Sequence, residues 1–174
     1  RAAILEAARS TFAERGYARA TIREIAQRAG VAHGLVLRHF TSKENLFVEA
    51  VPGARDLDEL VAGDLDTLPA RIAAGFVNRM ENSKGEDPFL ILIRSAASNE
   101  EAAVRLFTSM HERSSAAYRI ALHGPDADLR IEFLAAQLIG VCFSRYVIAG
   151  PLAELSPEEL TAHLTRVIRG ILFD

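Results

Sequence analysis

Residues 31–46, VAHGLVLRHFTSKENL, combine basic and apolar side chains in a pattern that indicates a binding surface. If a short helix begins near residue 33, Val36 and Phe40 share one of its faces and take the buried side. The side chains left on the solvent side are Leu35, Leu37 and Arg38. Leucines exposed to water are a liability, but in the major groove of DNA they can cover thymine methyl groups, and an arginine there can contact a guanine edge or a phosphate.

Two short helices joined by a tight turn would hold this surface in place. Thr21 and Glu24 form a capping box that starts a helix, and Gly30 is suited to end it about nine residues later. The turn at residues 30–32 and a second helix over about 33–39 have the spacing of a helix-turn-helix. In that motif the second helix lies in the major groove, so we expect DNA contacts from its first turns.

Capping residues, prolines and apolar spacing predict helices along the rest of the chain as well. Gly16 is expected to end a first helix, and a second capping box, Thr41 and Glu44, is expected to start the fourth. The predicted helices outside the helix-turn-helix cover about residues 2–15, 41–51, 54–64, 69–82, 88–98, 100–123, 126–149 and 157–172. We therefore expect an all-α protein with a helix-turn-helix head at residues 1–50 and a helical body at residues 51–174.

Charge is distributed unevenly between these two parts. Residues 1–50 carry eight Lys and Arg against five Asp and Glu, whereas the rest of the chain carries twelve against eighteen. A basic head on an acidic body favours a polyanion as the partner of the head alone. The overall net charge of -3 hides this division.

The head resembles the TetR family of transcriptional regulators. The resemblance lies in FAERGYARATIREIAQRAGVAHG and in the shorter strings HF and SKENLF, and it covers most of residues 4–50. It implies a regulator that binds a palindromic operator in double-stranded DNA. By position it assigns phosphate and base contacts to Thr21 and Arg23. The full set of predicted DNA contacts, from the helix argument and the resemblance together, is Thr21, Arg23, His33, Gly34, Leu35, Leu37, Arg38, His39 and Lys43.

The chain departs from the family pattern at two places. The family usually has threonine, leucine and tyrosine where this chain has Leu35, Val36 and Leu37, so a common phosphate contact of the tyrosine hydroxyl is missing. Pro52 and Gly53 interrupt the fourth helix, which in the family links the head to the body. This interruption is a hinge or a simple kink.

The layout of helices in the body is also similar to that of the family, which implies a homodimer and a small-molecule effector. In the family the last two long helices of each subunit form a four-helix bundle, and an apolar cavity receives the effector. The predicted dimer residues are Leu164, Val167, Ile168 and Ile171. The predicted pocket has an apolar lining of Phe76, Met80, Phe89, Phe107, Met110, Phe143 and Tyr146, with polar groups from Arg94, His111 and Gln137. Each lining residue also fits an ordinary helical core.

Simpler interpretations stand beside these predictions. Leu35 and Leu37 would pack inside the head if their helix were rotated. His33 and His39 have no carboxylate or cysteine at metal-ligand spacing, so we expect no metal and no cofactor. The apolar run at residues 133–149 contains Gln137 and Arg145, which argues against a membrane span. The single cysteine, Cys142, fits a buried helix in a reducing cytoplasm.

These observations together predict a cytoplasmic DNA-binding regulator, a repressor that a small, largely apolar effector releases from its operator. They do not indicate an enzyme. Two alternatives stay open at this point. One is a helical enzyme or small-molecule carrier with a vestigial head, and the other is a DNA binder that needs no effector.

Overall fold

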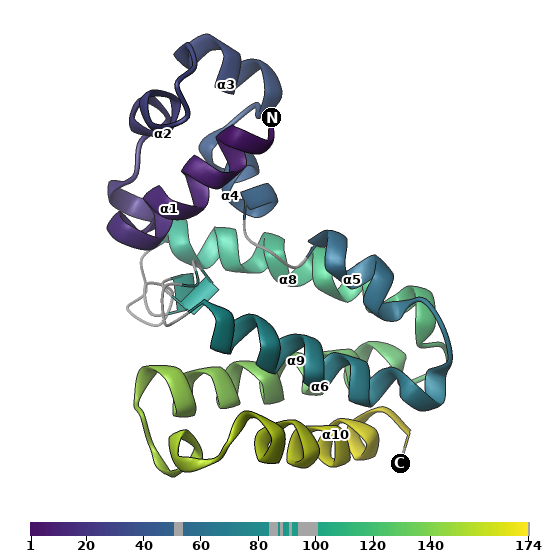
Figure 1. Cartoon of the computed structure of the whole chain (residues 1–174). Helices are drawn as coiled ribbons and strands as arrows, with labels where there is room; N and C mark the ends of the chain where they lie inside the picture. Colours follow the sequence, from purple (N-terminus) through teal and green to yellow (C-terminus); the bar gives the residue numbers. More distant parts are fainter. Residues whose placement is uncertain (51–53, 84–86, 88, 91, 94–100, 174) are drawn as a thin grey trace. The chain divides into compact units, whose positions relative to one another are not determined.

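The structure, a computed structural model, describes residues 1–50, 54–83, 87, 89–90, 92–93 and 101–173 (Figure 1). These residues form helices, turns and bends, with no β-strand among them, so the predicted all-α fold is confirmed. None of the helices described is both long and apolar enough to cross a membrane. Arg94 and the Pro52-Gly53 pair lie outside the described residues, as does Pro88 at the start of a predicted helix.

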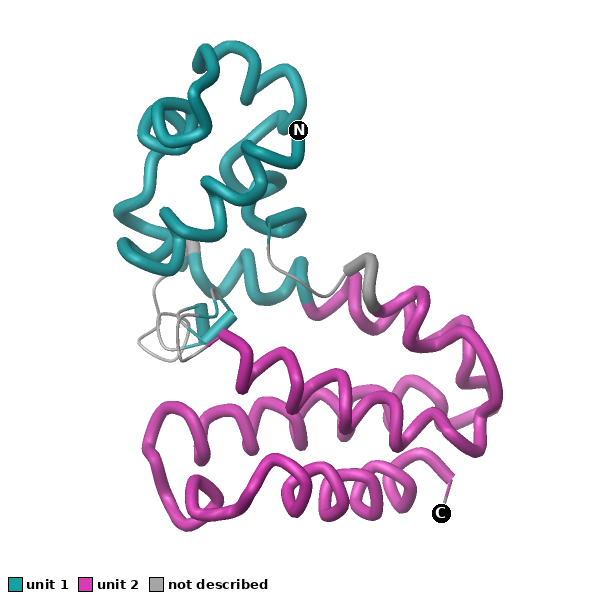
Figure 2. Tube along the Cα trace, viewed as in Figure 1, with its two compact units in different colours: residues 1–54, 86–110 teal, residues 55–85, 111–174 magenta. Residues whose placement is uncertain are grey.

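The chain divides into two compact units (Figure 2). Unit 1 comprises Arg1–Ala54 and Glu86–Met110, and unit 2 comprises Arg55–Gly85 and His111–Asp174. Unit 1 therefore contains the predicted head together with a later segment that local sequence signals did not assign to it. Helix α8 (Glu101–Ala121) contributes residues to both units.

Local signals place most helix boundaries of unit 1, but the first helix continues past its predicted end at residue 15 to Arg19. The helices of this unit are α1 (Ala2–Arg19), α2 (Ile22–Arg28), α3 (His33–His39) and α4 (Lys43–Ala50), with the first half of α8. Gly16 interrupts α1 with a φ of 71°, and Gly30 follows α2 with a φ of 67°. Both angles are positive φ values that glycine adopts without a Cβ clash, so Gly30 ends α2 and Gly16 breaks α1 without ending it.

The predicted capping box of α4 is wrong by one residue. Ser42, rather than Thr41, caps the helix, because its Oγ accepts a hydrogen bond from the backbone N–H of Asn45 at 3.1 Å. The carboxylate of Glu44 accepts a 2.5 Å hydrogen bond from the hydroxyl of Tyr17 instead. Two hydroxyl residues stand side by side here, and the path of the chain decides which of them caps the helix.

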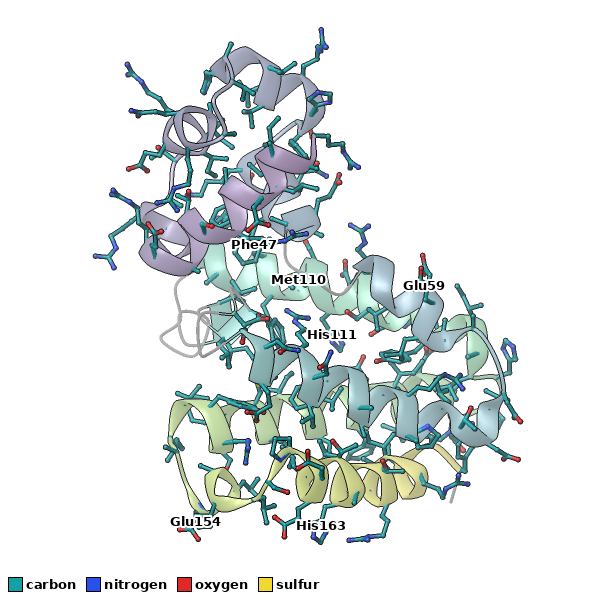
Figure 3. The ribbon with its side chains drawn as sticks, viewed as in Figure 1. Phe47, Glu59, Met110, His111, Glu154 and His163 are labelled. Atoms are coloured by element: carbon teal, nitrogen blue, oxygen red, sulfur yellow. The ribbon has the colours of Figure 1, made fainter. Side chains whose placement is uncertain are left out.

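Aromatic rings form the centre of the unit 1 core. Phe12 and Phe47 meet edge to face with centroids 4.8 Å apart, and Tyr17 meets Phe47 at 5.3 Å. Phe47 is labelled in Figure 3. Val36 and Phe40 are fully buried in the same core, as the spacing of α3 predicts. Leu92, Ala103 and Leu106 join this cluster from the later segment.

Unit 2 consists of helices that pack along their lengths. They are α5 (Ala54–Val61), α6 (Leu68–Asn82), α9 (Ala127–Cys142) and α10 (Pro157–Phe173), with the second half of α8. Pro69 lies in the first turn of α6, where its missing N–H costs nothing. Ser156 and Glu159 cap α10 reciprocally, since each accepts a backbone N–H bond from the other, at 3.2 and 2.8 Å.

The inner side of α10 is buried in the core of its own chain. Leu160, Leu164, Ile168 and Leu172 are all at most 2% exposed and belong to one cluster with residues of α6 and α9. Two of the four predicted dimer residues, Leu164 and Ile168, are therefore already covered within the chain. This is a correction to the predicted dimer stripe. Val167 is 43% exposed and Ile171 is half-buried.

A buried arginine ties the end of α9 to α6. After Cys142 the chain makes a π-helical turn (Phe143–Val147) and then a 3₁₀ turn (Pro151–Glu154), where the sequence predicts continuous helix to residue 149. Arg145 in the π turn is 8% exposed and donates hydrogen bonds to Glu81 at 2.9 and 3.1 Å and to the carbonyl of Leu155 at 2.8 Å. Its charge is thus fully partnered, as a buried charge must be.

Candidate functional site

The α2–turn–α3 segment has the geometry of a helix-turn-helix. Both halves of the capping box are present, because the Thr21 side chain accepts from the N–H of Glu24 and the Glu24 carboxylate accepts from the N–H of Thr21, each at 3.2 Å. The N–H of Val31 donates to the carbonyl of Ala26 at 3.0 Å, and the half-buried Val31 side chain packs against the core. The turn is therefore closed by backbone bonds and held by an apolar contact.

Helix α3 presents apolar and basic side chains to the outside. Leu37 is 41% exposed and Leu35 is half-buried, so the rotated helix that would bury both leucines is not observed. A Cβ at Gly34 would meet nothing within 4 Å, so packing inside the chain does not require a glycine there. The remaining predicted contacts with exposed side chains are Thr21, Arg23, His33, Arg38 and His39.

The arginines of the head fall into two groups. Four arginines contact carboxylates: Arg1 with Glu49, Arg9 with Glu6, Arg15 with Glu24, and Arg28 with Glu14. Arg28 holds both oxygens of Glu14, at 2.6 and 2.7 Å, and these bonds lower the pKa of that carboxyl. Within the part of the chain that the structure describes, Arg19, Arg23 and Arg38 have no carboxylate partner.

The three unpaired arginines lie in or directly before the helix-turn-helix. Their charge is available to an external anion, whereas a paired arginine must first leave its carboxylate. Arg19 was not among the predicted contacts, although a basic residue two positions before the N-cap of α2 is visible in the sequence. What the sequence does not reveal is which arginines are paired, because the partners come from other helices.

Lys43 is placed differently from these arginines. Its ammonium lies 4.4 Å from the ring centroid of Tyr17 and donates to the carbonyl of Ala18 at 3.3 Å. The residue is half-buried, and this burial lowers the pKa of its ammonium. Lys43 is therefore held against the protein rather than extended into solvent.

The predicted effector residues are divided between the two units. Phe89, Phe107 and Met110 pack against the core of unit 1. In unit 2, Met80 is fully buried beside Cys142, and Tyr146 donates to Glu81 at 2.9 Å. His111 (labelled in Figure 3) lies 2.8 Å from Glu132. The remaining candidates of unit 2, all half-buried, are Phe76, Gln137 and Phe143.

Two hydroxyl groups on α8 stand out in the otherwise apolar core of unit 2. Ser115 is 3% exposed and its Oγ has no hydrogen-bond partner among the described residues. Tyr118, three residues later on the same face, is 7% exposed, and burial raises the pKa of its hydroxyl, so the group is neutral. A buried hydroxyl without a partner costs free energy, which makes Ser115, with Tyr118 beside it, a candidate for a ligand contact. Sequence reasoning missed both residues.

An open groove of about 420 Å³ lies further along the same helix. Its walls come from the end of α5, the following loop and the end of α8: Asp58, Val61, Ala62, Gly63, Leu65, Ile120 and Ala121. None of the predicted effector residues lines it. Ala121 lies three residues after Tyr118, but the groove opens on a side of α8 that is turned away from Ser115, since Ile120 in its wall is 67% exposed.

The outer side of α9 carries an uncharged stripe. Leu129 and Phe133 are 56% and 59% exposed, and Ala136 and Gly140 continue the stripe at heptad-like spacing. On α10, which packs beside α9 (Figure 1), Val167 and Gly170 are also accessible. We call these residues the outer face of α9 and α10. Among the residues described, no group of three or more His, Cys, Asp or Glu side chains forms a metal site.

Two family models match the chain. The model described as bacterial regulatory proteins, tetR family, matches residues 4–50, and the model described as tetracyclin repressor-like, C-terminal domain, matches residues 66–172. Together they cover both the head and most of the body.

Curated relatives match mainly through the head. An HTH-type transcriptional repressor of Mycobacterium tuberculosis is 60% identical over 45 residues, which are 26% of this chain and 24% of the relative. The HTH-type transcriptional repressor KstR2 of the same species is 39% identical over 88 residues, 49% of this chain and 39% of the relative. The chain thus spans between a quarter and two fifths of the lengths of these relatives.

Solved structures match over the whole chain. A TetR-family regulator from Streptomyces coelicolor A3 is 30% identical, with a TM-score of 0.72 over 100% of this chain and 94% of that chain. NalD of Pseudomonas aeruginosa, described as the secondary repressor of the MexAB-OprM multidrug efflux pump, is 25% identical, with a TM-score of 0.59 over 99% of this chain and 96% of that chain.

Proposed function

From the premise that this chain belongs to the TetR family of bacterial transcriptional regulators, we propose that it is a repressor that binds a two-fold operator as a homodimer. A small effector bound by the body releases it. We place this activity in the cytoplasm, where the DNA is. The observation that carries the DNA-binding part is the helix-turn-helix surface, on which Arg19, Arg23 and Arg38 have no carboxylate partner among the described residues.

Helix α3 supplies the base contacts in this proposal. Leu37 covers thymine methyl groups, Arg38 meets a guanine edge or a phosphate, and Gly34 lets the backbone approach the groove closely. His33 and the half-buried Leu35 border the same surface. Thr21, His39 and Lys43 contact the phosphates around it and set the register of α3 in the groove, and Arg23 adds a further base contact from the start of α2.

The test is selection of bound fragments from sheared genomic DNA at fixed, near-physiological salt, followed by affinity measurements on the selected site. Arg38→Ala is expected to weaken binding by about 1–3 kcal/mol and to relax the preference at one base position. Arg113→Ala is the matched control, because Arg113 is an exposed arginine of unit 2. Equal affinity of both variants and the wild type for the selected site would contradict the assignment of α3 as the recognition helix.

The outer face of α9 and α10 is the proposed dimer interface. Of the predicted stripe, Val167 and Ile171 remain accessible, and Leu129 and Phe133 on α9 take the place of Leu164 and Ile168. A two-fold interface uses the same patch on both subunits. An uncharged face with small residues at Ala136 and Gly140 allows two copies of α9 to approach closely.

Ser115 and Tyr118 are the polar groups that we assign to effector recognition. The Ser115 hydroxyl is buried without a protein partner among the described residues, and Tyr118, whose ring belongs to the apolar core, lies one turn further along α8. A ligand with an apolar body and one hydrogen-bonding oxygen or nitrogen satisfies the Ser115 hydroxyl, as in typical small-molecule sites. Phe76, which packs against the same core, is the predicted lining residue that fits this position.

Thermal-shift screening of a small-molecule library, followed by calorimetry with and without operator, tests the effector proposal. A tenfold release of operator requires about 1.4 kcal/mol of differential affinity, and operator must weaken effector binding by the same factor. Ser115→Ala should weaken effector binding, while Ser109→Ala, an exposed serine on α8, serves as the matched control. If no compound that shifts the melting temperature alters operator affinity, the protein is a DNA binder without an effector.

A further inference from the structure

We propose that Tyr17 is a positioning residue for DNA binding, and that its ring holds the ammonium of Lys43 where a DNA phosphate meets it. The inference rests on the proposed DNA-binding function. Tyr17 thus belongs to the buried core rather than to the exposed surface, and yet it determines the affinity for DNA. Glu44 completes the arrangement by holding the tyrosine in place.

Contacts within unit 1 leave the tyrosine ring little freedom. Tyr17 is 5% exposed and packs against Phe12, at a centroid distance of 6.0 Å, and Phe47, at 5.3 Å, which also contact each other. Its hydroxyl donates a 2.5 Å hydrogen bond to Oε1 of Glu44. The ring face that remains is the one over which the ammonium of Lys43 lies, 4.4 Å from the centroid.

Lys43 is ordered before any DNA is present. A cation over an aromatic face is attracted by the ring quadrupole, and partial desolvation strengthens this attraction. A second contact, the 3.3 Å bond to the carbonyl of Ala18, fixes the direction in which the ammonium points. Fixing a long lysine side chain normally costs conformational entropy at the moment of binding. In this protein the Lys43 side chain loses most of that conformational entropy on folding, before DNA binds.

Glu44 is the next residue, and its charge offsets through space part of the lowering that burial causes in the pKa of the Lys43 ammonium, but its carboxylate is directed to Tyr17. The Oε1 atom of Glu44 accepts from Tyr17, and the structure shows no ion pair between Lys43 and Glu44 in the described part of the chain. The tyrosine thus engages the carboxylate through its hydroxyl and the ammonium through its ring. The positive charge of Lys43 stays available to an external anion.

The position of this ammonium is suitable for a phosphate contact of the helix-turn-helix. Ala18, whose carbonyl it contacts, lies three residues before Thr21, the N-cap of α2. Lys43 itself is the first residue of α4. The cation therefore lies beside the chain that enters the motif, where Thr21 and Arg23 are the neighbouring predicted contacts.

The experiment uses a mixed-sequence DNA duplex, so that no operator is needed, and measures affinity as a function of salt. Lys43→Ala should reduce the salt slope by about one, as for one lost phosphate contact. Tyr17→Leu should weaken binding roughly two- to fivefold, the range of a cation–π contact. Tyr17→Phe, which keeps the ring, should retain the wild-type salt slope.

The double variant Tyr17→Leu/Lys43→Ala decides between positioning and general destabilisation. If Tyr17 acts through Lys43, the double variant binds no more weakly than Lys43→Ala alone. Additive losses would overturn the inference. A wild-type chain that binds no duplex at any salt would overturn the proposed function and this inference with it, so the two failures are distinguishable.

An NMR measurement keeps the inference testable if Tyr17→Leu does not fold. The ε-methylene protons of Lys43 should be shifted upfield by the ring current of residue 17 in the wild type and in Tyr17→Phe. The shift should persist when the duplex is added. Unshifted Lys43 protons in the free wild-type protein would show that the ring does not hold the ammonium, and would overturn the inference.

Discussion

Phe133→Asp should separate the proposed homodimer into folded monomers. Phe133 is 59% exposed on α9 and lies outside the buried core of unit 2, so the chain does not need it to fold. Aspartate at this position places two carboxylates in a two-fold interface, where neither has a partner. The helical circular-dichroism signal of the variant should remain that of the wild type.

The expected loss of dimer stability follows from the exposed area of the Phe133 side chain. A phenylalanine side chain has about 200 Å² of accessible surface, so 59% exposure leaves roughly 120 Å² to be buried by a partner. At about 25 cal/mol per Å² this contributes roughly 3 kcal/mol, and roughly 6 kcal/mol for the two copies in a symmetric dimer. Losing the burial of both Phe133 side chains should therefore raise the dissociation constant of the dimer by about four orders of magnitude.

Sedimentation velocity over a range of micromolar concentrations is the assay. The wild type is expected to sediment as a dimer throughout and Phe133→Asp as a monomer. Ile120→Asp is the matched control, because Ile120 is 67% exposed on α8, outside the outer face of α9 and α10, and this variant should remain a dimer. A monomeric wild type, or a Phe133→Asp variant that is still dimeric at the lowest concentration, would refute the interface.

Two further predictions concern stability. In the monomeric Phe133→Asp background, Ile168→Ala should lower the free energy of unfolding by about 2–5 kcal/mol, because Ile168 is fully buried. Val167→Ala should change the free energy of unfolding by less than about 0.5 kcal/mol. Urea titrations in which Ile168→Ala and Val167→Ala lost equal stability would contradict the assigned faces of α10. The hydrogen bond from Tyr17 lowers the pKa of Glu44, so its contribution to stability is present above the ordinary value of 4.5 and is lost as the pH falls through the lowered pKa. The stability difference between wild type and Tyr17→Phe, measured by urea unfolding, should therefore shrink below pH 4.5, and a constant difference would contradict this mechanism.

Local signals were sufficient for most helix boundaries and for the motif. Gly16 and Gly30 adopt positive φ, and the capping box predicted for α2 forms both of its hydrogen bonds. These features depend on a few neighbouring residues, so a single sequence contains them. The face of α3 was predictable for the same reason, since Val36 and Phe40 are one helical turn apart.

Features that depend on distant residues were not predictable. The broad apolar stripe of α10 does not reveal that Ile168 faces α6 while Val167 faces outward, because the choice depends on where α6 lies. The cap of α4 moved to Ser42 because the path of the chain, not the residue type, decides which hydroxyl residue takes the cap. The isolation of Ser115 from any described partner is likewise a property of the packed core.

The sequence by itself therefore determined that this protein is helical, where most of its helices begin and end, and that its head carries a helix-turn-helix with an excess of positive charge. Only the tertiary structure decided which of those charges are free. Arg28 is held by Glu14 from α1, whereas Arg38 has no carboxylate partner among the described residues. The physical reason is that helix and cap formation depend on residues within one or two turns, whereas ion pairing and burial depend on side chains that folding brings together from distant segments.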